Sequence, residues 1–248
     1  MDTHLAVKVD PENAIKIISG RLATNNFCHV RGPELLKHIE VSHRQVDHII
    51  SFWPNLVLDH YMADGGIYRY RRYGQFELSA RCERLNLMPH EAYKQSSEIN
   101  KLNGDVQRYF EPLETEFSNA LLLEKLLKFM AKIYNDRLGQ NITWNIKLHP
   151  YRIIANTGST GKPTPEGLHR DGVTFVASLL LQRSNIVGGI TTITNNDGEL
   201  IEQIEMTEPF EIIMADDANS MHEVSPIRAI SDKDNFRDVL VIAFTKQL

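Results

Sequence analysis

His169 and Asp171 place an imidazole and a carboxylate two positions apart in the chain. Where the chain is extended, residues i and i+2 point to the same face, so both side chains could bind one metal ion. His222 is the best third ligand, because it begins a predicted strand just after the turn at 216–219. Two histidines and one carboxylate on one face form the arrangement that holds non-haem Fe(II) and leaves coordination positions open.

The His-x-Asp pair alone carries little information, because ten histidines in 248 residues make such tripeptides common by chance. The alternative is a surface turn in which Asp171 pairs with Arg170. The context favours the metal site, since the pair stands where a predicted strand begins. His222 and a further basic residue, Arg237, follow at suitable places.

Arg237 lies at the head of the last predicted strand, and alternation puts it on one face with the apolar residues at 239, 241 and 243. A guanidinium buried among such residues is costly unless it binds an anion. Its planar fork suits a carboxylate, to which it can donate two parallel hydrogen bonds. The alternative is an edge-strand arginine that faces water or pairs with Asp238.

The elements that would position these residues change in character near residue 140. Before it we expect a helix over 43–52 opened by a Ser42–Gln45 capping box, a strand over 68–78, and a helix over 116–138 ended by Gly139. After it we expect strands at 144–155, 173–183, 189–195, 200–206, 209–215, 220–225 and 237–246. Consecutive short strands without crossover helices favour an antiparallel sandwich or jelly roll.

We therefore predict a mainly β protein whose N-terminal helices flank one face of the sandwich. The whole chain, 1–248, is interpreted as a single domain. Residues 1–140 would supply helices and strands that cover the core, and residues 141–248 the main jelly-roll strands with the metal site.

Composition excludes several classes of protein. With 42% apolar and 24% charged residues the chain is globular, and its net charge of −5 offers no basis for binding nucleic acid or an anionic membrane. No apolar run is long enough to span a bilayer, and the first residues lack a signal-peptide pattern. Cys28 and Cys82 are too few for a disulfide scaffold, so we expect a cytoplasmic protein.

These residues resemble a known family. His169-x-Asp171, His222 and Arg237 are similar to the pattern of the Fe(II)/2-oxoglutarate dioxygenases. A closer resemblance, to the bacterial branch containing L-isoleucine dioxygenase and related free amino-acid hydroxylases, covers about residues 65–248. It is carried by Leu-His-Pro-Tyr-Arg at 148–152, Gly-Gly at 188–189, Met-His-Glu-Val-Ser-Pro-Ile at 221–227 and Phe-Arg-Asp at 236–238.

The resemblance implies a double-stranded β-helix, a cupin-like jelly roll, that holds Fe(II) through His169, Asp171 and His222. The 2-oxoglutarate co-substrate would bind the iron and set its far carboxylate on Arg237, with Ser225 assisting. O2 would be the second co-substrate, and ascorbate would stimulate turnover. The implied activity is hydroxylation of a small aliphatic free L-amino acid, coupled to decarboxylation of 2-oxoglutarate.

The resemblance also suggests that the strand at 68–78 lines the substrate pocket. Arginines are frequent there, at Arg69, Arg71, Arg72, Arg81 and Arg84. Most are expected to be solvated, with Arg72 the candidate for binding a substrate carboxylate. Arg152 is a second candidate, and Tyr70 is an expected pocket wall.

Two other functions stay open at this point. One keeps the oxygenase chemistry but applies it to a peptide or another metabolite. The other is a metal-binding regulatory or stress protein on the same fold, with little turnover. Intact Asp171 and Arg237 favour an enzyme, because a pure binding module needs neither an open metal site nor an oxoacid anchor. The sequence does not indicate the oligomeric state.

Overall fold

The structure, a computed structural model, describes residues 11–96 and 104–247. Its helices are Pro11–Asn25 (α1), Gly32–Ile39 (α2), His43–Ile50 (α3), the short 3-10 helix Trp53–Asn55 (η1), Thr115–Ser118 (α4) and Leu121–Leu138 (α5). Its strands are Phe27–Val30 (β1), Val57–Leu58 (β2), Arg69–Arg71 (β3), Gly74–Leu78 (β4), Leu85–Leu87 (β5), Trp144–Ile154 (β6), Phe175–Ser184 (β7), Ile186–Gly188 (β8), Ile190–Thr194 (β9), Leu200–Glu205 (β10), Ile212–Asp216 (β11), Met221–Val224 (β12), Ile227–Ala229 (β13) and Phe236–Lys246 (β14).

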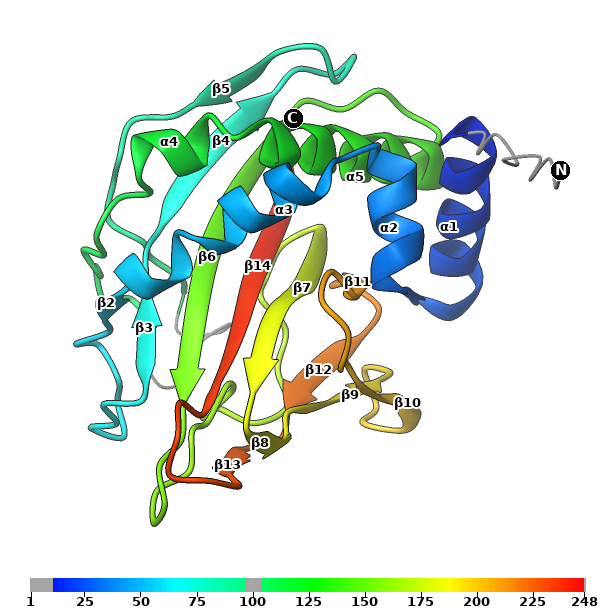
Figure 1. Ribbon diagram of the computed structural model, residues 1–248. Helices are drawn as coiled ribbons and strands as arrows, with labels where there is room; N and C mark the ends of the chain where they lie inside the picture. The colour runs from blue at the N-terminus through cyan, green and yellow to red at the C-terminus, as the bar shows by residue number, and fades with distance from the viewer. Residues whose placement is uncertain (1–10, 97–103, 248) are drawn as a thin grey trace, which may run out of the picture.

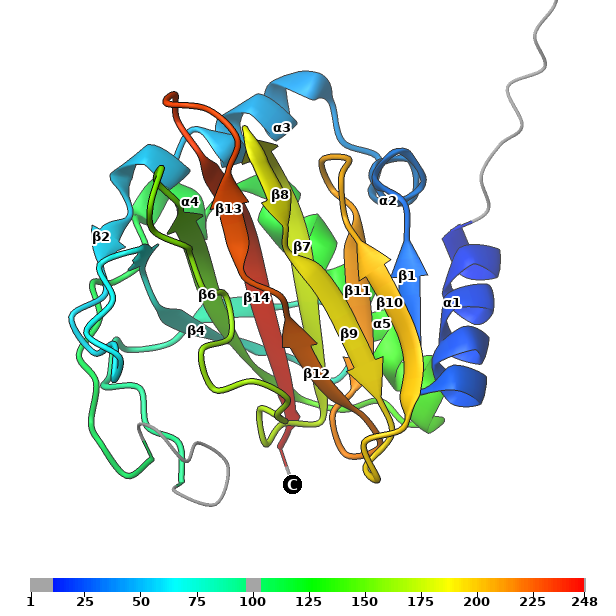
Figure 2. The ribbon, with the colours of Figure 1, turned by 90° about the horizontal axis from the view of Figure 1, so that it is seen from below.

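The strands form two layers. The larger sheet runs β1-β11-β7-β14-β6-β3-β2, with β4 also paired to β6 and β5 to β4. The second layer consists of β10-β9-β12 and β13-β8, and it lies across the open face of the larger sheet (Figure 2). All the strand pairings are antiparallel. The predicted mainly β jelly roll is therefore confirmed.

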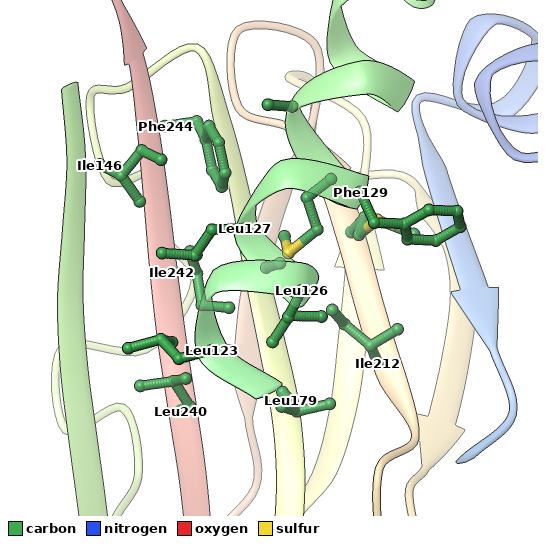
Figure 3. Packing of buried hydrophobic residues seen from close by; sticks show 14 of the residues in the cluster. Leu123, Leu126, Leu127, Phe129, Ile146, Leu179, Ile212, Leu240, Ile242 and Phe244 are labelled. Atoms are coloured by element: carbon green, nitrogen blue, oxygen red, sulfur yellow. The ribbon is translucent and has the colours of Figure 1, made fainter. Parts of the chain in front are cut away.

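The helices cover the other face of the larger sheet (Figure 1). Helix α5 is the centre of this layer, and its Leu123, Leu126 and Leu127 are fully buried. They pack against the even-numbered side chains of β14, including Leu240 and Ile242 (Figure 3). The odd-numbered side chains of the same strand point to the opposite face, between the two layers. Alternation along each central strand thus separates the apolar core from the site.

Helix α3 begins as predicted. The Ser42 side chain accepts a hydrogen bond from the Gln45 backbone, and the Gln45 side chain accepts one from the Ser42 backbone, which completes the capping box. Gly139 ends α5 in the left-handed conformation, with φ of 64°.

Two predicted elements are interrupted. The helix expected over 116–138 is broken at Ala120, which is extended, so that Phe117 on α4 packs against Trp53 while α5 lies on the sheet. The strand expected over 68–78 is two strands, β3 and β4, that pair with β6 in one continuous register. The gap falls opposite Pro150, which has no N–H to donate to the ladder. No helix in the described part of the chain is long and apolar enough to cross a membrane.

Candidate active site

His169 and His222 are joined by their backbones. The His169 N–H donates to the His222 carbonyl at 3.0 Å, and the His222 N–H donates to the His169 carbonyl at 2.9 Å. This antiparallel bridge joins β12 to the segment before β7 and brings the imidazole centroids to 4.5 Å. The pattern of strands and turns predicts this adjacency.

Asp171 faces both rings. Its Oδ1 lies 4.0 Å from Nε2 of His169, and its Oδ2 lies 3.6 Å from Nε2 of His222. The three candidate ligand atoms all lie within 4.8 Å of one another. Metal–ligand bonds are about 2 Å long, so small side-chain rotations bring all three onto one ion.

The protonation states suit a metal. Nδ1 of His169 lies 2.8 Å from the Gly167 carbonyl, to which it donates, and this leaves the Nε2 lone pair for the ion. Burial, helped by repulsion from His169, lowers the pKa of His222 to about 3, so its imidazole is neutral and able to coordinate. Burial raises the pKa of Asp171, a cost that a cation would offset.

Asp217 holds the backbone that carries Asp171. Its carboxylate accepts the N–H groups of Asp171 at 2.9 Å, Gly172 at 2.7 Å and Val173 at 2.9 Å. The Asp217 side chain is buried, and burial raises its pKa while these hydrogen bonds oppose the rise. The position of Asp171 therefore depends on Asp217, which is not among the three candidate metal ligands.

Asp217→Asn is expected to weaken Fe(II) binding by about 10- to 100-fold, the range typical of lost outer-sphere partners. Asparagine keeps the shape but presents one oxygen and an NH2 group to three N–H donors. Anaerobic Fe(II) titration measures the effect, with the exposed Asp197→Asn as control. Equal affinity of Asp217→Asn and the wild type would show that the 171–173 backbone holds its position alone.

A cavity of about 370 Å³ lies between the two layers beside the triad. Arg237 lines it, is only 1% exposed, and its Nε and Nη2 atoms have no hydrogen-bond partner in the described residues. Burial and the nearby Arg183 lower the pKa of Arg237 to about 10. An unsatisfied buried guanidinium fits an anionic ligand, so the site suits the far carboxylate of 2-oxoglutarate.

Gly189 packs directly on Arg237. Its φ is +75°, and an added Cβ would lie 3.1 Å from Cδ of Arg237 and 3.2 Å from Cγ2 of Ile227. The Gly188-Gly189 pair bends the chain between β8 and β9 at this point. Glycine is required there both by the backbone conformation and by the close approach of the arginine.

Gly189→Ala is expected to cost about 1–2 kcal/mol in unfolding free energy from the left-handed backbone, and also to raise the KM for 2-oxoglutarate. Gly198→Ala is the matched control, because φ is +82° there and nothing lies within 4 Å of an added Cβ. Denaturant unfolding should show a similar loss in both variants, whereas only Gly189→Ala should change the KM. A similar rise in the KM for 2-oxoglutarate in Gly198→Ala would refute the argument that the contact of residue 189 with Arg237 causes the change.

Ser225 does not line the cavity. Its hydroxyl accepts a hydrogen bond from the Ile190 N–H at 3.0 Å and so joins β9 to the chain between β12 and β13. In the structure this hydroxyl stabilises the bend beside Gly189, and its predicted assistance to Arg237 stays a prediction.

The three residues predicted to bind substrate also lie outside the cavity. Arg72 donates to the carbonyls of Asn55 and Pro112. Arg152 donates to both carboxylate oxygens of Asp238, at 2.8 and 2.7 Å. Tyr70 packs against the helix-side core. Alternation explains this for Tyr70 on β3 and Arg152 on β6, because the odd-numbered residues of these strands line the cavity and the even-numbered ones point away from it. Arg72 follows the end of β3.

The cavity face of these strands carries other candidates. Arg69 and Arg71 on β3 line the cavity, as do Lys147, His149 and Tyr151 on β6. The period-two pattern of 147–151 could have revealed the last three. Tyr93, Arg108 and Glu166 also line the cavity, but they come from irregular segments, and no sequence pattern indicated them.

A jelly roll that brings two histidines and a carboxylate together beside a buried, unpartnered arginine defines the class of non-haem Fe(II) oxygenases. The 2OG-Fe dioxygenase family model matches residues 51–243. The chain belongs to this family, and it is a dioxygenase that uses Fe(II), 2-oxoglutarate and O2. When bound, these groups supply the oxidation of a substrate coupled to decarboxylation of 2-oxoglutarate.

Solved structures share the fold of this chain. The chain is similar to a bsmA homologue from Methylobium petroleophilum PM1, with 29% identity, a TM-score of 0.85, and coverage of 99% of this chain and 96% of that chain. IDO from Bacillus thuringiensis has 20% identity, a TM-score of 0.76, and coverage of 94% and 96%. The Fe(II)/α-ketoglutarate-dependent dioxygenase TqaL has 15% identity, a TM-score of 0.75, and coverage of 96% and 89%. No curated protein matches.

Proposed function

We propose that the protein hydroxylates a small aliphatic free L-amino acid. In this proposal His169, Asp171 and His222 bind Fe(II), and Arg237 binds the far carboxylate of 2-oxoglutarate. The observation that carries the proposal is the small, cation-rich cavity beside the triad. The resemblance of 148–152 and 221–227 to the isoleucine dioxygenase-like branch supports the amino-acid class.

The size of the cavity favours a small substrate. Ligand pockets usually measure about 300–1,000 Å³, so 370 Å³ is near the lower limit. It must hold 2-oxoglutarate as well as the substrate, which leaves room for little more than one amino acid. Apolar side chains beside the triad, including Val173, Val176 and Val224, would contact an aliphatic group and exclude water.

The ammonium group of an amino acid requires an acceptor near the metal. Glu166 lines the cavity, and its Oε1 lies 3.6 Å from Nε2 of His169. Asp64, the other carboxylate at that side, already accepts from Tyr68, Gly66 and Lys162. Glu166 is therefore our candidate for the ammonium acceptor.

A panel of free amino acids tests the proposal. Leucine, isoleucine, valine and methionine are incubated with enzyme, Fe(II), ascorbate and 2-oxoglutarate, and products are examined for the mass gain of one oxygen. We expect at least one to be hydroxylated and to stimulate succinate formation. Turnover with amidated or peptide substrates alone would overturn the free amino-acid assignment. No stimulated turnover with any of the four would also overturn the small aliphatic amino-acid assignment.

A further inference from the structure

Positive charge is in excess on the cavity face of β3. Arg69 donates to the fully buried Asp59 through Nε and Nη2, both at 2.8 Å. Nη1 of Arg71 lies 3.7 Å from the same Oδ2 atom of Asp59. One carboxylate therefore serves two guanidinium groups. Nε of Arg71 has no hydrogen-bond partner in the part of the chain that the structure describes.

Arg108 and Lys147 add to this excess. Arg108 is 3% exposed; its Nη2 donates to Gln95 at 2.9 Å, while its Nε has no partner in the described segments. Lys147 is half-buried, and burial lowers the pKa of its ammonium group. No carboxylate of residues 11–96 or 104–247 forms an ion pair with either side chain.

Tyr93 lies among these cations. Its ring centroid lies 4.8 Å from Cζ of Arg108, 5.9 Å from Cζ of Arg71 and 5.6 Å from Nζ of Lys147. Gln95 links the cations to the metal site, because it accepts from Arg108 at 2.9 Å and donates to the backbone carbonyl of Asp171 at 3.5 Å. The three cations and the triad line the same cavity.

We propose that Arg71, Arg108 and Lys147 form a second anion subsite, separate from Arg237, that binds the carboxylate of the primary substrate. The reason is energetic: Arg108 and Lys147 pair with no carboxylate of the described residues, Arg71 shares Asp59 with Arg69, and a bound carboxylate offsets the cost of burying this excess charge. This inference rests on the proposed function for the oxygenase chemistry. It adds the side chains that would bind the substrate carboxylate, and with them the reason why amides, esters and peptides extended at their carboxyl end are excluded.

The test compares Arg108→Met with the exposed Arg84→Met as matched control. Methionine keeps contacts with Tyr93 and Phe110 but removes the charge. Probes are L-leucine, L-leucinamide, N-acetyl-L-leucine and 4-methylpentanoate, each assayed for stimulated succinate formation. In the wild type the three acids should stimulate turnover and the amide should not. In Arg108→Met the KM for the acids should rise about 10- to 100-fold, with the KM for 2-oxoglutarate unchanged.

Each of the other results with these probes decides whether the subsite or the free amino-acid assignment stands. The subsite is overturned if L-leucinamide stimulates succinate formation as strongly as L-leucine does. It is also overturned if none of the three acids stimulates succinate formation. A rise in the KM for 2-oxoglutarate alone also overturns it, because the cations would then serve the co-substrate. Stimulation by 4-methylpentanoate or N-acetyl-L-leucine but not by L-leucine leaves the subsite standing and refutes the free amino-acid assignment.

Stability measurements separate binding from structure. Removing a buried, unpaired cation should raise the melting temperature of Arg108→Met and of the second variant, Lys147→Met. Addition of 4-methylpentanoate should raise the melting temperature of the wild type more than that of either variant. Destabilisation of both variants, with equal response to the acid, would assign Arg108 and Lys147 a structural role and overturn the proposal.

Discussion

Asp171→Ala is expected to reduce 2-oxoglutarate turnover by well over a hundredfold. Loss of a mere outer-sphere partner costs about 10- to 100-fold in metal affinity or activity, so loss of a proposed ligand should cost more. The carboxylate faces both histidines, at 4.0 and 3.6 Å, and its removal leaves two imidazoles and no anionic ligand to hold a cation. Anaerobic Fe(II) titration and succinate formation provide the two measurements.

Folding must be preserved for this result to bear on the metal. Asp171 is part of no helix or strand, and its N–H bond to Asp217 survives in alanine, so the melting temperature should change little. Asp197→Ala, at an exposed turn, is the control and should bind Fe(II) like the wild type. Full metal affinity in Asp171→Ala would exclude Asp171 from the ligand set.

Arg237→Lys should raise the KM for 2-oxoglutarate strongly and leave that for the primary substrate nearly unchanged. Lysine keeps a positive charge but loses the two parallel hydrogen bonds of the guanidinium fork. A charge-assisted hydrogen bond contributes about 1.5–3 kcal/mol, which corresponds to roughly 10- to 150-fold in KM. Initial rates at varied 2-oxoglutarate, with the primary substrate saturating, measure the effect.

The exposed Arg228→Lys serves as control for the same chemical change and should leave both KM values alone. The pattern of the loss matters more than its size. A rise in both KM values would indicate a distorted cavity. An unchanged KM for 2-oxoglutarate would show that Arg237 does not bind this co-substrate.

The sequence predicted the jelly roll because its strands are short and consecutive, with turn residues between them and no crossover helix. The closeness of His169 and His222 followed from the same topology, since a strand that starts just after a tight turn can return beside the segment before β7. The burial of Arg237 followed from its alternation with apolar residues on β14. In each case local pattern and overall fold favour the same answer.

The substrate end of the cavity could not be predicted in this way. In the run 68–73 tyrosine and arginine alternate with few exceptions, and either face would make a chemically reasonable pocket wall. Which face is chosen depends on where α5 packs, a contact between segments far apart in the chain. Arg72 was therefore selected where Arg71 lines the cavity. Arg108 and Tyr93 lie in irregular segments, so only the folded chain reveals them.

The backbone bridge between His169 and His222 has a consequence for metal exchange. The amide and carbonyl of each residue satisfy those of the other, so the spacing of the two imidazoles is set by the peptide chain and needs no ion to maintain it. Metal binding then requires side-chain adjustment and no rebuilding of the backbone between the two histidines. We therefore expect protein stripped of its metal to keep its fold and to regain the centre when Fe(II) is supplied.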